Sequence, residues 1–336
     1  MKITMAHGSG GESTSRLISD IFSKHFSNEY LSRLEDSAVL PGNSRLALTT
    51  DSFVVTPIIF PGGDIGRLSV CGTVNDLLMS GAKPRYLTCG CVLEEGLDID
   101  VLDKVIASMA ETAREAGVQI VTGDTKVIEN RSENPGLIIN TSGVGFIDEK
   151  LDVPGPHRLQ DKDAIIVSGN LGDHHAAILG TRMGIESDIV SDNAPLCEMA
   201  GTLFEKGIRV HAMRDVTRGG LATVLLEFCS ASGCQIELAE TDLPVSKSVR
   251  DFCGILGLDP MYMGNEGKMV LSVAEKDAES ALSIVKNCRY GENAAVIGKV
   301  IKLENESSEP KLTVRTRIGG LRSVGPLYGE GLPRIC

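Results

Sequence analysis

Residues 101–126 read VLDKVIASMAETAREAGVQIVTGDTK. Apolar residues recur in the first part at helical spacing, at Val105, Ile106, Met109 and Ala113. This spacing predicts a helix from about Val101 to Ala116 that stops at Gly117, followed by a strand over Val118–Val121. Gly123-Asp124-Thr125-Lys126 then predicts a turn out of the strand. A helix that feeds a strand is the unit of layered α/β architecture.

The same mixture continues on both sides of this stretch. Before it we expect a short buried strand over 46–51, a helix around 70–78 and a strand over 86–93, and after it a strand over 137–144. Pro154-Gly155-Pro156 is the clearest linker signal. Beyond it we expect strands over 164–168, near Ile208, over 269–271 and over 295–297, helices over 196–206 and after Gly220, and a polar loop over 169–175.

A chain of 336 residues is longer than one hydrophobic core usually supports. We therefore predict an α/β protein of α+β type, with two domains of mixed sheets flanked by helices. The expected bounds are 1–153 for the first domain and 157–320 for the second, with a mobile tail over 321–336.

Composition restricts the classes of partner. The formal charge is −12, and no basic stripe offsets it, so nucleic acid is an unfavourable partner. The N-terminus lacks a signal-peptide core, and the apolar runs are too short to span a bilayer, which favours a soluble, cytoplasmic protein without a membrane. Carboxylates can still serve a phosphate substrate by holding a divalent metal.

Four acids of the first half fall at predicted element ends or polar turns, namely Asp36, Asp51, Asp76 and Asp124. Carboxylates with a nearby Lys126 suit Mg²⁺ and a nucleotide, because oxygen ligands hold the metal and an ammonium meets the phosphoryl charge. The alternative is that each acid caps a helix or fills a turn. The P-loop pattern and the dinucleotide fingerprint are both missing, so an ATP site would be of another type.

Two Gly-flanked loops of the second half carry polar groups. Arg218-Gly219-Gly220 offers a guanidinium and backbone amides at the start of a helix, and Gly264–Lys268 carries Glu266. Plain turns explain these glycines about as well. We favour a loop role for His174-His175, and core packing over zinc binding for Cys89 and Cys91, since zinc would need two further ligands.

The sequence ends with an arm, Gly331–Cys336, whose Gly and Pro argue against a regular element. A prenylated cysteine would stand four places from the end, so Cys336 does not fit that lipid motif. A disulfide is disfavoured in a cytosolic chain with nine cysteines. A working thiol on a mobile arm and an inert one both remain open.

Several motifs together resemble one family. They are His7–Gly11, Thr50-Asp51-Ser52, Val74-Asn75-Asp76, Val121–Lys126, Arg214–Gly220, Asn265–Lys268 and the ending Pro333-Arg334-Ile335-Cys336. They closely resemble the nickel-iron hydrogenase maturation factors of the HypE family, within the PurM (aminoimidazole ribonucleotide synthetase) superfamily. The resemblance covers nearly the whole chain and implies a PurM-like fold whose first domain dimerises through its sheets and binds ATP.

The resemblance also implies a reaction. The carbamoyltransferase HypF would place a carbamoyl group on Cys336, ATP would drive its dehydration to a thiocyanate, and cyanide would pass to iron on the HypC-HypD complex. Catalytic roles would fall to Cys336 as carrier, Glu266 as base and Lys126 at the phosphoryl group. Mg²⁺ would bind Asp36, Asp51, Asp76 and Asp124. Nucleotide contacts would come from Asp51, Asn75, Asp76, Gly123, Asp124, Thr125, Arg218, Gly219 and Gly220.

One position departs from the family pattern, which has Gly where this chain has His175. Two rival functions remain. The chain could be another ATP-dependent synthetase or kinase of the superfamily that acts on a small metabolite, or a non-enzymatic scaffold whose tail docks on a partner.

Overall fold

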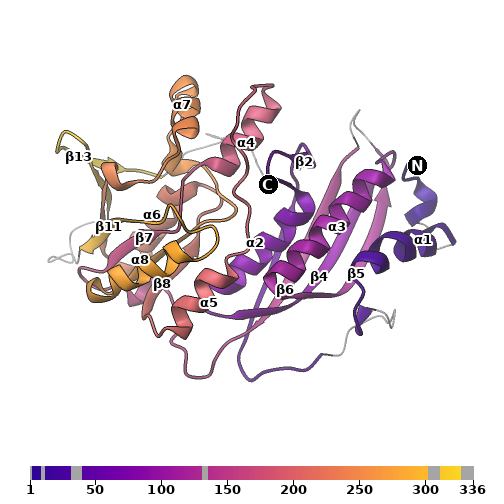
Figure 1. Cartoon of the computed structure of the whole chain (residues 1–336), viewed down its shortest axis with the longest axis horizontal. Coiled ribbons are helices and arrows are strands. Elements are labelled where there is room, and N and C mark those ends of the chain that lie inside the picture. Colours follow the sequence, from indigo (N-terminus) through magenta and orange to yellow (C-terminus); the bar gives the residue numbers. More distant parts are fainter. Residues whose placement is uncertain (1, 9–11, 32–39, 131–134, 302–310, 327–336) are drawn as a thin grey trace. The chain divides into compact units, whose positions relative to one another are not determined.

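The computed structural model describes residues 2–8, 12–31, 40–130, 135–301 and 311–326. The chain forms two compact units. Among the described residues, the first comprises the chain up to Leu78 together with Ala82–Lys150, and the second comprises Met79–Gly81 and the chain from Leu151 to Pro326 (Figure 1). Asp36 and Cys336 lie outside the described residues, as does most of the Gly-rich stretch near the N-terminus.

The first unit contains one four-stranded sheet in the order β1-β6-β4-β5. Only β4 and β5 run parallel, so the sheet is mixed as predicted. Its elements are η1 (Met5–Gly8), α1 (Glu12–Leu17), η2 (Ile18–Ser23), β1 (Leu46–Phe53), β2 (Ile59–Phe60), β3 (Gly63–Asp64), α2 (Ile65–Met79), β4 (Lys83–Glu94), α3 (Ile99–Ala116), β5 (Gln119–Ile128) and β6 (Leu137–Phe146).

Helix α3 confirms the prediction made from its apolar spacing. Asp98 caps its first turn by accepting a hydrogen bond from the Asp100 amide at 2.9 Å. Gly117 ends it in the left-handed conformation at φ 69°, which glycine adopts without strain. The predicted apolar stripe is buried along its length. Helices α2 and α3 lie together over one face of the sheet (Figure 1).

The two faces of this sheet differ in burial. Along β6 every second residue, from Leu137 to Gly145, is buried, and the alternate residues are only partly buried. The strand predicted over 46–51 is confirmed as part of β1, but its predicted burial is wrong, because β1 is an edge strand whose side chains alternate between partly buried and exposed. Leu46 and Leu48 point away from the helices and are 55% and 76% exposed. We call the side of the sheet that carries them the open face.

The predicted turn at Gly123-Asp124-Thr125-Lys126 is also wrong, because these residues continue β5 in register with β4. Gly123 permits this pairing. A Cβ atom at this position would lie 2.4 Å from the carbonyl oxygen of Cys89, too close for any side chain. The glycine that suggested a turn therefore allows close approach of two strand backbones.

The second unit contains a seven-stranded mixed sheet in the order β13-β12-β9-β11-β7-β10-β8, with β12 and β9 parallel. Its helices are η4 (Pro156–Arg158), α4 (Asp173–Arg182), α5 (Cys197–Glu205), α6 (Gly220–Ser232), η5 (Glu240–Asp242), α7 (Lys247–Leu256), η6 (Pro260–Tyr262), η7 (Glu275–Asp277) and α8 (Ala278–Asn287). Its strands are β7 (Ala164–Val167), β8 (Val210–Asp215), β9 (Gln235–Ala239), β10 (Met269–Val273), β11 (Ala295–Ile301), β12 (Leu312–Arg315) and β13 (Leu321–Val324).

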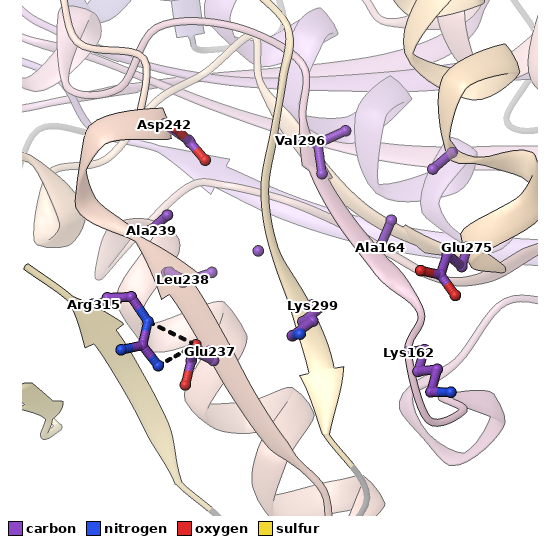
Figure 2. A pocket seen from close by; sticks show the side chains of 12 residues that line it. Lys162, Ala164, Glu237, Leu238, Ala239, Asp242, Glu275, Val296, Lys299 and Arg315 are labelled. Atoms are coloured by element: carbon purple, nitrogen blue, oxygen red, sulfur yellow. Dashed lines mark hydrogen bonds and ion pairs between the residues drawn. The ribbon is translucent and has the colours of Figure 1, made fainter. Parts of the chain in front are cut away.

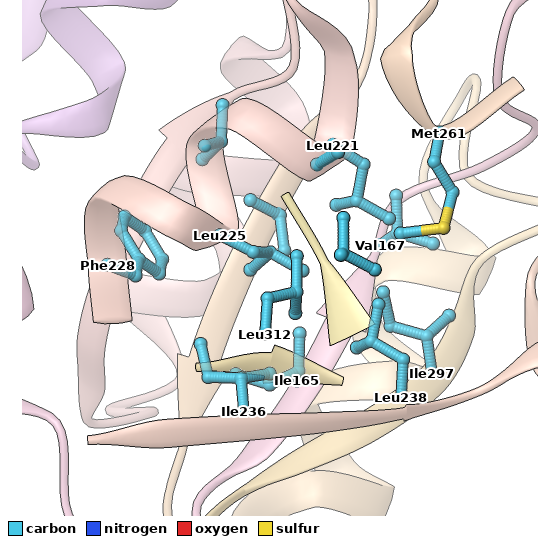
Figure 3. Packing of buried hydrophobic residues seen from close by; sticks show 14 of the residues in the cluster. Ile165, Val167, Leu221, Leu225, Phe228, Ile236, Leu238, Met261, Ile297 and Leu312 are labelled. Carbon is cyan, nitrogen blue, oxygen red and sulfur yellow. The ribbon is translucent and has the colours of Figure 1, made fainter. Parts of the chain in front are cut away.

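The core of this unit lies between α6 and the sheet. Figure 3 shows Leu221, Leu225 and Phe228 of α6 among side chains of the strands. The predicted strands over 164–168, 269–271 and 295–297 and the predicted helix over 196–206 are confirmed, and the strand expected near Ile208 is β8. Residues 321–324, which the sequence assigns to a tail, form β13 and pair with β12.

Among the residues that the structure describes, no helix combines the length and the apolar character needed to cross a bilayer.

A buried polar network ties the linker to the second sheet. One oxygen of Asp163, Oδ2, lies 2.7 Å from His211 Nδ1, and it accepts hydrogen bonds from Ser272 Oγ at 3.0 Å and from the Gln160 amide at 2.9 Å. The His211 carbonyl in turn accepts from the Gly155 amide at 2.8 Å. Since Asp163 and His211 are nearly inaccessible to water, loss of either leaves polar groups buried without compensation.

We expect Asp163→Ala to lower the free energy of unfolding by about 3 kcal/mol, because it strands the three donors that converge on this carboxylate. Urea denaturation measures the effect. Asp188→Ala, which removes an exposed carboxylate, is the control and should change stability by less than about 0.5 kcal/mol. Equal losses for both variants would contradict this account.

Gly123→Ala should destabilise the first unit by about 1–3 kcal/mol, because the new methyl group meets the backbone of Cys89. The matched control is Gly90→Ala on the neighbouring strand, where a Cβ would find its nearest neighbours at an ordinary 3.8 Å. Thermal unfolding of both variants tests the difference. If Gly123→Ala unfolds at the same temperature as the wild type, the two strands can move apart more easily than their pairing indicates.

Candidate functional site

Two of the predicted acids lie close together on the helix-covered side of the first sheet. Asp76 projects from α2, and its Oδ2 accepts a hydrogen bond from Thr49 of β1 at 2.9 Å. Asp51 lies two residues further along β1, and its Oδ2 is 3.8 Å from where a Cβ on Gly72 would stand. Gly72 precedes Asp76 by one helical turn, so Asp51 and Asp76 lie along the same side of α2. Both are partly exposed, and this arrangement can hold a cation.

Asp124 and Lys126 form a separate pair on β5. Lys126 Nζ lies 2.9 Å from Asp124 Oδ2, and the Thr125 amide donates to Asp124 Oδ1 at 2.9 Å. The hydrogen bond from Lys126 holds the pKa of Asp124 below its usual value. Both side chains are about two-thirds exposed, at 67% and 65%. A nucleotide phosphate can therefore reach this ammonium group.

The strand register places these two pairs on opposite faces of the sheet. Asp124 pairs with Gly90, which pairs with Asn140, and the amide of Asn140 donates to Ser52 Oγ on the open face. Asp51 pairs with Thr141, which pairs with Cys89. Thr141 and Cys89 are buried, so this neighbouring row of residues across the sheet lies on the helix side. Asp124 is also three strands from Asp51, about 14 Å. One chain therefore does not bring Asp124 together with Asp51 and Asp76.

The residues that the structure describes contain no group of three or more His, Cys, Asp or Glu side chains placed to share a metal ion. Two carboxylates nevertheless suit Mg²⁺, which is commonly held by one or two of them together with substrate phosphates. Asn75, predicted to contact nucleotide, is 2% exposed within α2 and faces the interior of the unit.

Cys89 and Cys91 pack under α3. Their sulfur atoms are 3.6 Å apart, and Cys89 Sγ is 3.7 Å from Met109 Sδ. The contact with Cys89, together with burial, raises the pKa of Cys91 well above that of a free thiol. The predicted core packing of these two thiols is confirmed, since both are buried and Cys89 contacts Met109 of α3.

In the second unit three loops meet around Asn265, whose side chain is completely buried. Its Oδ1 accepts from the Gly172 amide at 2.7 Å, and its Nδ2 donates to the carbonyls of Val216 and Met263 at 3.2 and 3.1 Å. The next residue, Glu266, is also buried. Asn265 thus fixes the loop that carries the predicted base against the loops before α4 and α6.

Glu266 is held in a charged environment that the sequence did not reveal. Its amide donates to Asp192 Oδ1 at 3.0 Å, and Asp192 Oδ2 forms an ion pair with Lys268 at 3.2 Å. Burial, reinforced by the charge of Asp192, raises the pKa of Asp173 to about 6. Asp173 and Asp192 were missed because their sequence surroundings resemble ordinary loop acids.

Gly267 allows the close packing of this loop, because a Cβ there would lie 1.9 Å from the Asp192 carbonyl oxygen. Gly220 has a similar role, because its Cβ would meet the Met261 carbonyl oxygen at 2.5 Å. Gly219 and Gly220 begin α6 with positive φ angles, and Arg218 beside them is exposed. The predicted phosphate loop therefore presents a guanidinium to solvent at a helix N-terminus.

The polar loop predicted over 169–175 is wrong in its second half, because α4 begins at Asp173. His174 and His175 are both buried in its first turn. His174 Nδ1 lies 2.7 Å from Ser191 Oγ, and burial lowers the pKa of His175 to about 4, so His175 stays neutral. The hydrogen bond from the His175 amide to the Gly264 carbonyl adds to the packing of the Glu266 loop against α4.

A further hollow of about 370 Å³ lies over β9 and β11 of the second sheet (Figure 2). It contains none of the predicted site residues. Its charged lining is balanced, and Glu237 and Arg315 of the adjacent strands β9 and β12 form an ion pair at one side of it, at 3.0 Å. The other charged residues that line it are Lys162, Asp242, Glu275 and Lys299.

Family models match both halves of the chain. Residues 34–147 match the AIR synthase related protein N-terminal domain, and residues 160–309 match the corresponding C-terminal domain. The carbamoyl dehydratase HypE of Escherichia coli K12 is 44% identical, with 99% of each chain covered.

Solved structures agree with these matches over the whole fold. A hydrogenase maturation protein HypE in complex with ATP superposes with a TM-score of 0.93 at 46% identity, covering 99% of each chain. A HypE-HypF complex contains a chain that superposes with a TM-score of 0.79 at 43% identity, covering 93% of this chain and 99% of that one. This chain therefore belongs to the carbamoyl dehydratase HypE family, a two-domain branch of the AIR synthase related proteins.

Proposed function

We propose that this chain uses ATP to dehydrate a carbamoyl group carried on the sulfur of Cys336, forming a thiocyanate that supplies cyanide to the iron of a nickel-iron hydrogenase. The observation that carries the proposal is the similarity over the full length to HypE carbamoyl dehydratases, one of which has been solved with ATP. In this proposal the carboxylates and Lys126 of the first unit bind Mg²⁺ and phosphate, and Glu266 of the second unit accepts the protons.

The reaction must remove oxygen from an amide-like carbon. The carbamoyl oxygen attacks the γ-phosphorus of ATP, so an O–P bond forms and ADP leaves. One N–H proton passes to a base while the C–O bond breaks and phosphate departs, and loss of the second N–H proton completes the nitrile. Overall, the thiocarbamate and ATP are converted to the thiocyanate, ADP and phosphate. The oxygen atom removed from the carbamoyl group becomes part of the phosphate, and the two N–H protons are released to it or to the base.

In this proposal Asp51 and Asp76 hold Mg²⁺ together with nucleotide oxygens, and Asp36 and Asp124 complete the set. The two partly exposed carboxylates on β1 and α2 fit this role, since Mg²⁺ takes one or two carboxylates alongside phosphates. When bound, Mg²⁺ neutralises charge on the phosphate oxygens. Lys126 meets the transferring phosphoryl group, and Gly123 and Thr125 keep Lys126 and Asp124 on the strand.

Asp124 can join the other acids only if a second chain contributes. We place a homodimer contact on the open face, where exposed Leu46 and Leu48 lie beside a hydrogen-bonded polar group of Thr50, Ser142 and Asn140. Sheet faces with exposed leucines are favourable to bury against an equivalent surface. Asp124 and Lys126 point toward this same face, so dimerisation would bring them to the partner's open face. Because β5 and β1 are the edge strands, Asp124 could meet the partner's Asp51 and Asp76 only around a sheet edge.

Glu266 acts as the base for the N–H protons, and Arg218 with the Gly219 and Gly220 amides binds phosphate. Glu266 is buried, so proton transfer there is shielded from bulk water. The ion pair of Lys268 with Asp192 fixes the charge next to it. HypF supplies the carbamoyl group, as its complex with a similar HypE suggests, and a HypC-HypD complex receives the cyanide.

Cys336→Ser should abolish thiocyanate formation, because an oxygen carrier yields no S–CN bond. Intact-protein mass spectrometry after incubation with HypF, carbamoyl phosphate and Mg-ATP measures the carbamoyl gain and the subsequent loss of water. The control Cys197→Ser, which removes a partly exposed thiol of α5, should leave both mass changes in place. Thiocyanate on the Cys336→Ser chain would overturn the proposal, because another cysteine would then be the carrier.

Asp76→Asn should weaken Mg-ATP binding by on the order of tenfold or more, because an amide replaces a carboxylate ligand while still accepting the Thr49 hydrogen bond. Calorimetric titration at several Mg²⁺ concentrations measures the affinity. Asp103→Asn on α3, whose carboxylate bonds Lys24 and His25 on the surface, serves as control and should bind normally. Unchanged binding by Asp76→Asn would remove this residue from the metal site.

A further inference from the structure

The backbone of Glu266 is hydrogen-bonded to residues 191–194 on both sides of its side chain. Its amide donates to Asp192 Oδ1 at 3.0 Å, and its carbonyl oxygen accepts from the Ala194 amide at 3.4 Å. The Glu266 side chain leaves the backbone between these two bonds. The point from which it extends is therefore fixed relative to the carboxylate of Asp192.

Lys268 binds the other oxygen of the same carboxylate. Its Nζ lies 3.2 Å from Asp192 Oδ2 and donates to the Gly267 carbonyl at 3.2 Å. Its stem packs on Gly169, where a Cβ atom would stand 2.8 Å from the Cε of Lys268. The side chains of Lys268 and Asp192 are 8% and 4% exposed, so water screens their charges little.

These two charges act on a second carboxyl group nearby, that of Asp173 at the start of α4. Burial is the main cause that raises the pKa of Asp173 to about 6, the charge of Asp192 raises it as well, and the charge of Lys268 lowers it. Because Glu266 is bonded to Asp192 directly, the same two charges act on Glu266 with the same signs.

Other titratable groups stand on the elements packed against this loop. On α4 and on the loop before α6 they are His174, His175, Asp215 and Arg218. His175 stays neutral, His174 Nδ1 lies 2.7 Å from Ser191 Oγ, and Arg218 is exposed. All four are unchanged in every variant compared below, so differences between those variants report on Asp192 and Lys268.

We propose that Asp192 and Lys268 are positioning residues for the Glu266 base, the carboxylate of Asp192 strengthening its hold on a proton and the ammonium of Lys268 weakening it. This inference rests on the proposed function. Burial alone favours the protonated carboxyl group, which cannot accept an N–H proton. Lys268 opposes that effect, and Asp192 holds Lys268 in place while offsetting part of its charge.

The test compares variants that remove one charge each and keep the shape of the side chain. Asp192→Asn retains an oxygen for the Glu266 amide, and Lys268→Met retains the apolar stem. Chains are first carbamoylated by HypF at one pH and then mixed with Mg-ATP over a range of pH, so that the pH dependence of HypF does not enter. The rate of thiocyanate formation in a single turnover gives the midpoint of the acid limb, where protonation of Glu266 stops the reaction.

Asp192→Asn should move this midpoint to lower pH by about one unit, because an unopposed ammonium favours the ionised carboxylate of Glu266. Lys268→Met should move it to higher pH by about as much, and the double variant should return it close to the wild-type value. The same two changes in an exposed ion pair of α7, Asp251→Asn and Lys247→Met, are the controls and should not move it.

A structural role alone lowers the rate without opposite shifts, so unshifted midpoints, or midpoints that move in the same direction, would overturn the inference. Asp192→Asn is isosteric and decides the matter by itself should Lys268→Met not fold. The titration of Glu266 is also followed without turnover, by carbon NMR of chains with labelled glutamate carboxyl groups, its signal being the one that Glu266→Gln lacks. If the wild-type chain forms no thiocyanate, the proposed function fails, and this titration still tests the two charges.

Discussion

The buried side chain of Asn265 makes three hydrogen bonds, to backbone groups of Gly172, Val216 and Met263. A buried amide with satisfied donors and acceptors stabilises one arrangement strongly, since any displacement leaves polar groups unpaired. The three loops that it joins adjoin α4, α6 and η6. The positions of Asp173, of the Arg218 loop and of Glu266 therefore depend on one another through this residue.

In the first unit the corresponding constraint is the alternation of side chains in a single sheet. Because helices cover only one face, Asp51 and Thr49 of β1 share their side with Asp76 of α2, and Asp124 faces away. The same alternation leaves Leu46 and Leu48 exposed beside polar Thr50. This open face therefore carries the exposed leucines along β1 and the Asp124-Lys126 ion pair along β5.

Much of the fold could be predicted from local signals. The apolar spacing of α3 and the glycine that ends it were sufficient for that helix, and short apolar runs predicted the central strands. Glycine misled at Gly123, because a turn and a close strand contact both require the absence of a side chain. His174 and His175 misled in a similar way, since their burial depends on loops distant in sequence, at Ser191 and Gly264.

The candidate site was predictable in its residue types and less so in its geometry. Asp51 and Asp76 lie within β1 and α2 and not at their ends, and they come close together because β1 and α2 face each other on one side of the sheet. Strand register decides which face of the sheet a side chain points to. Because side chains alternate along a strand, a shift of one residue moves a side chain to the opposite face. Asp51 and Asp124 fall in adjacent rows of the sheet, so they point to opposite sides. Asp51 and Asp124 of one chain therefore do not share a site, although both lie on edge strands of the same sheet.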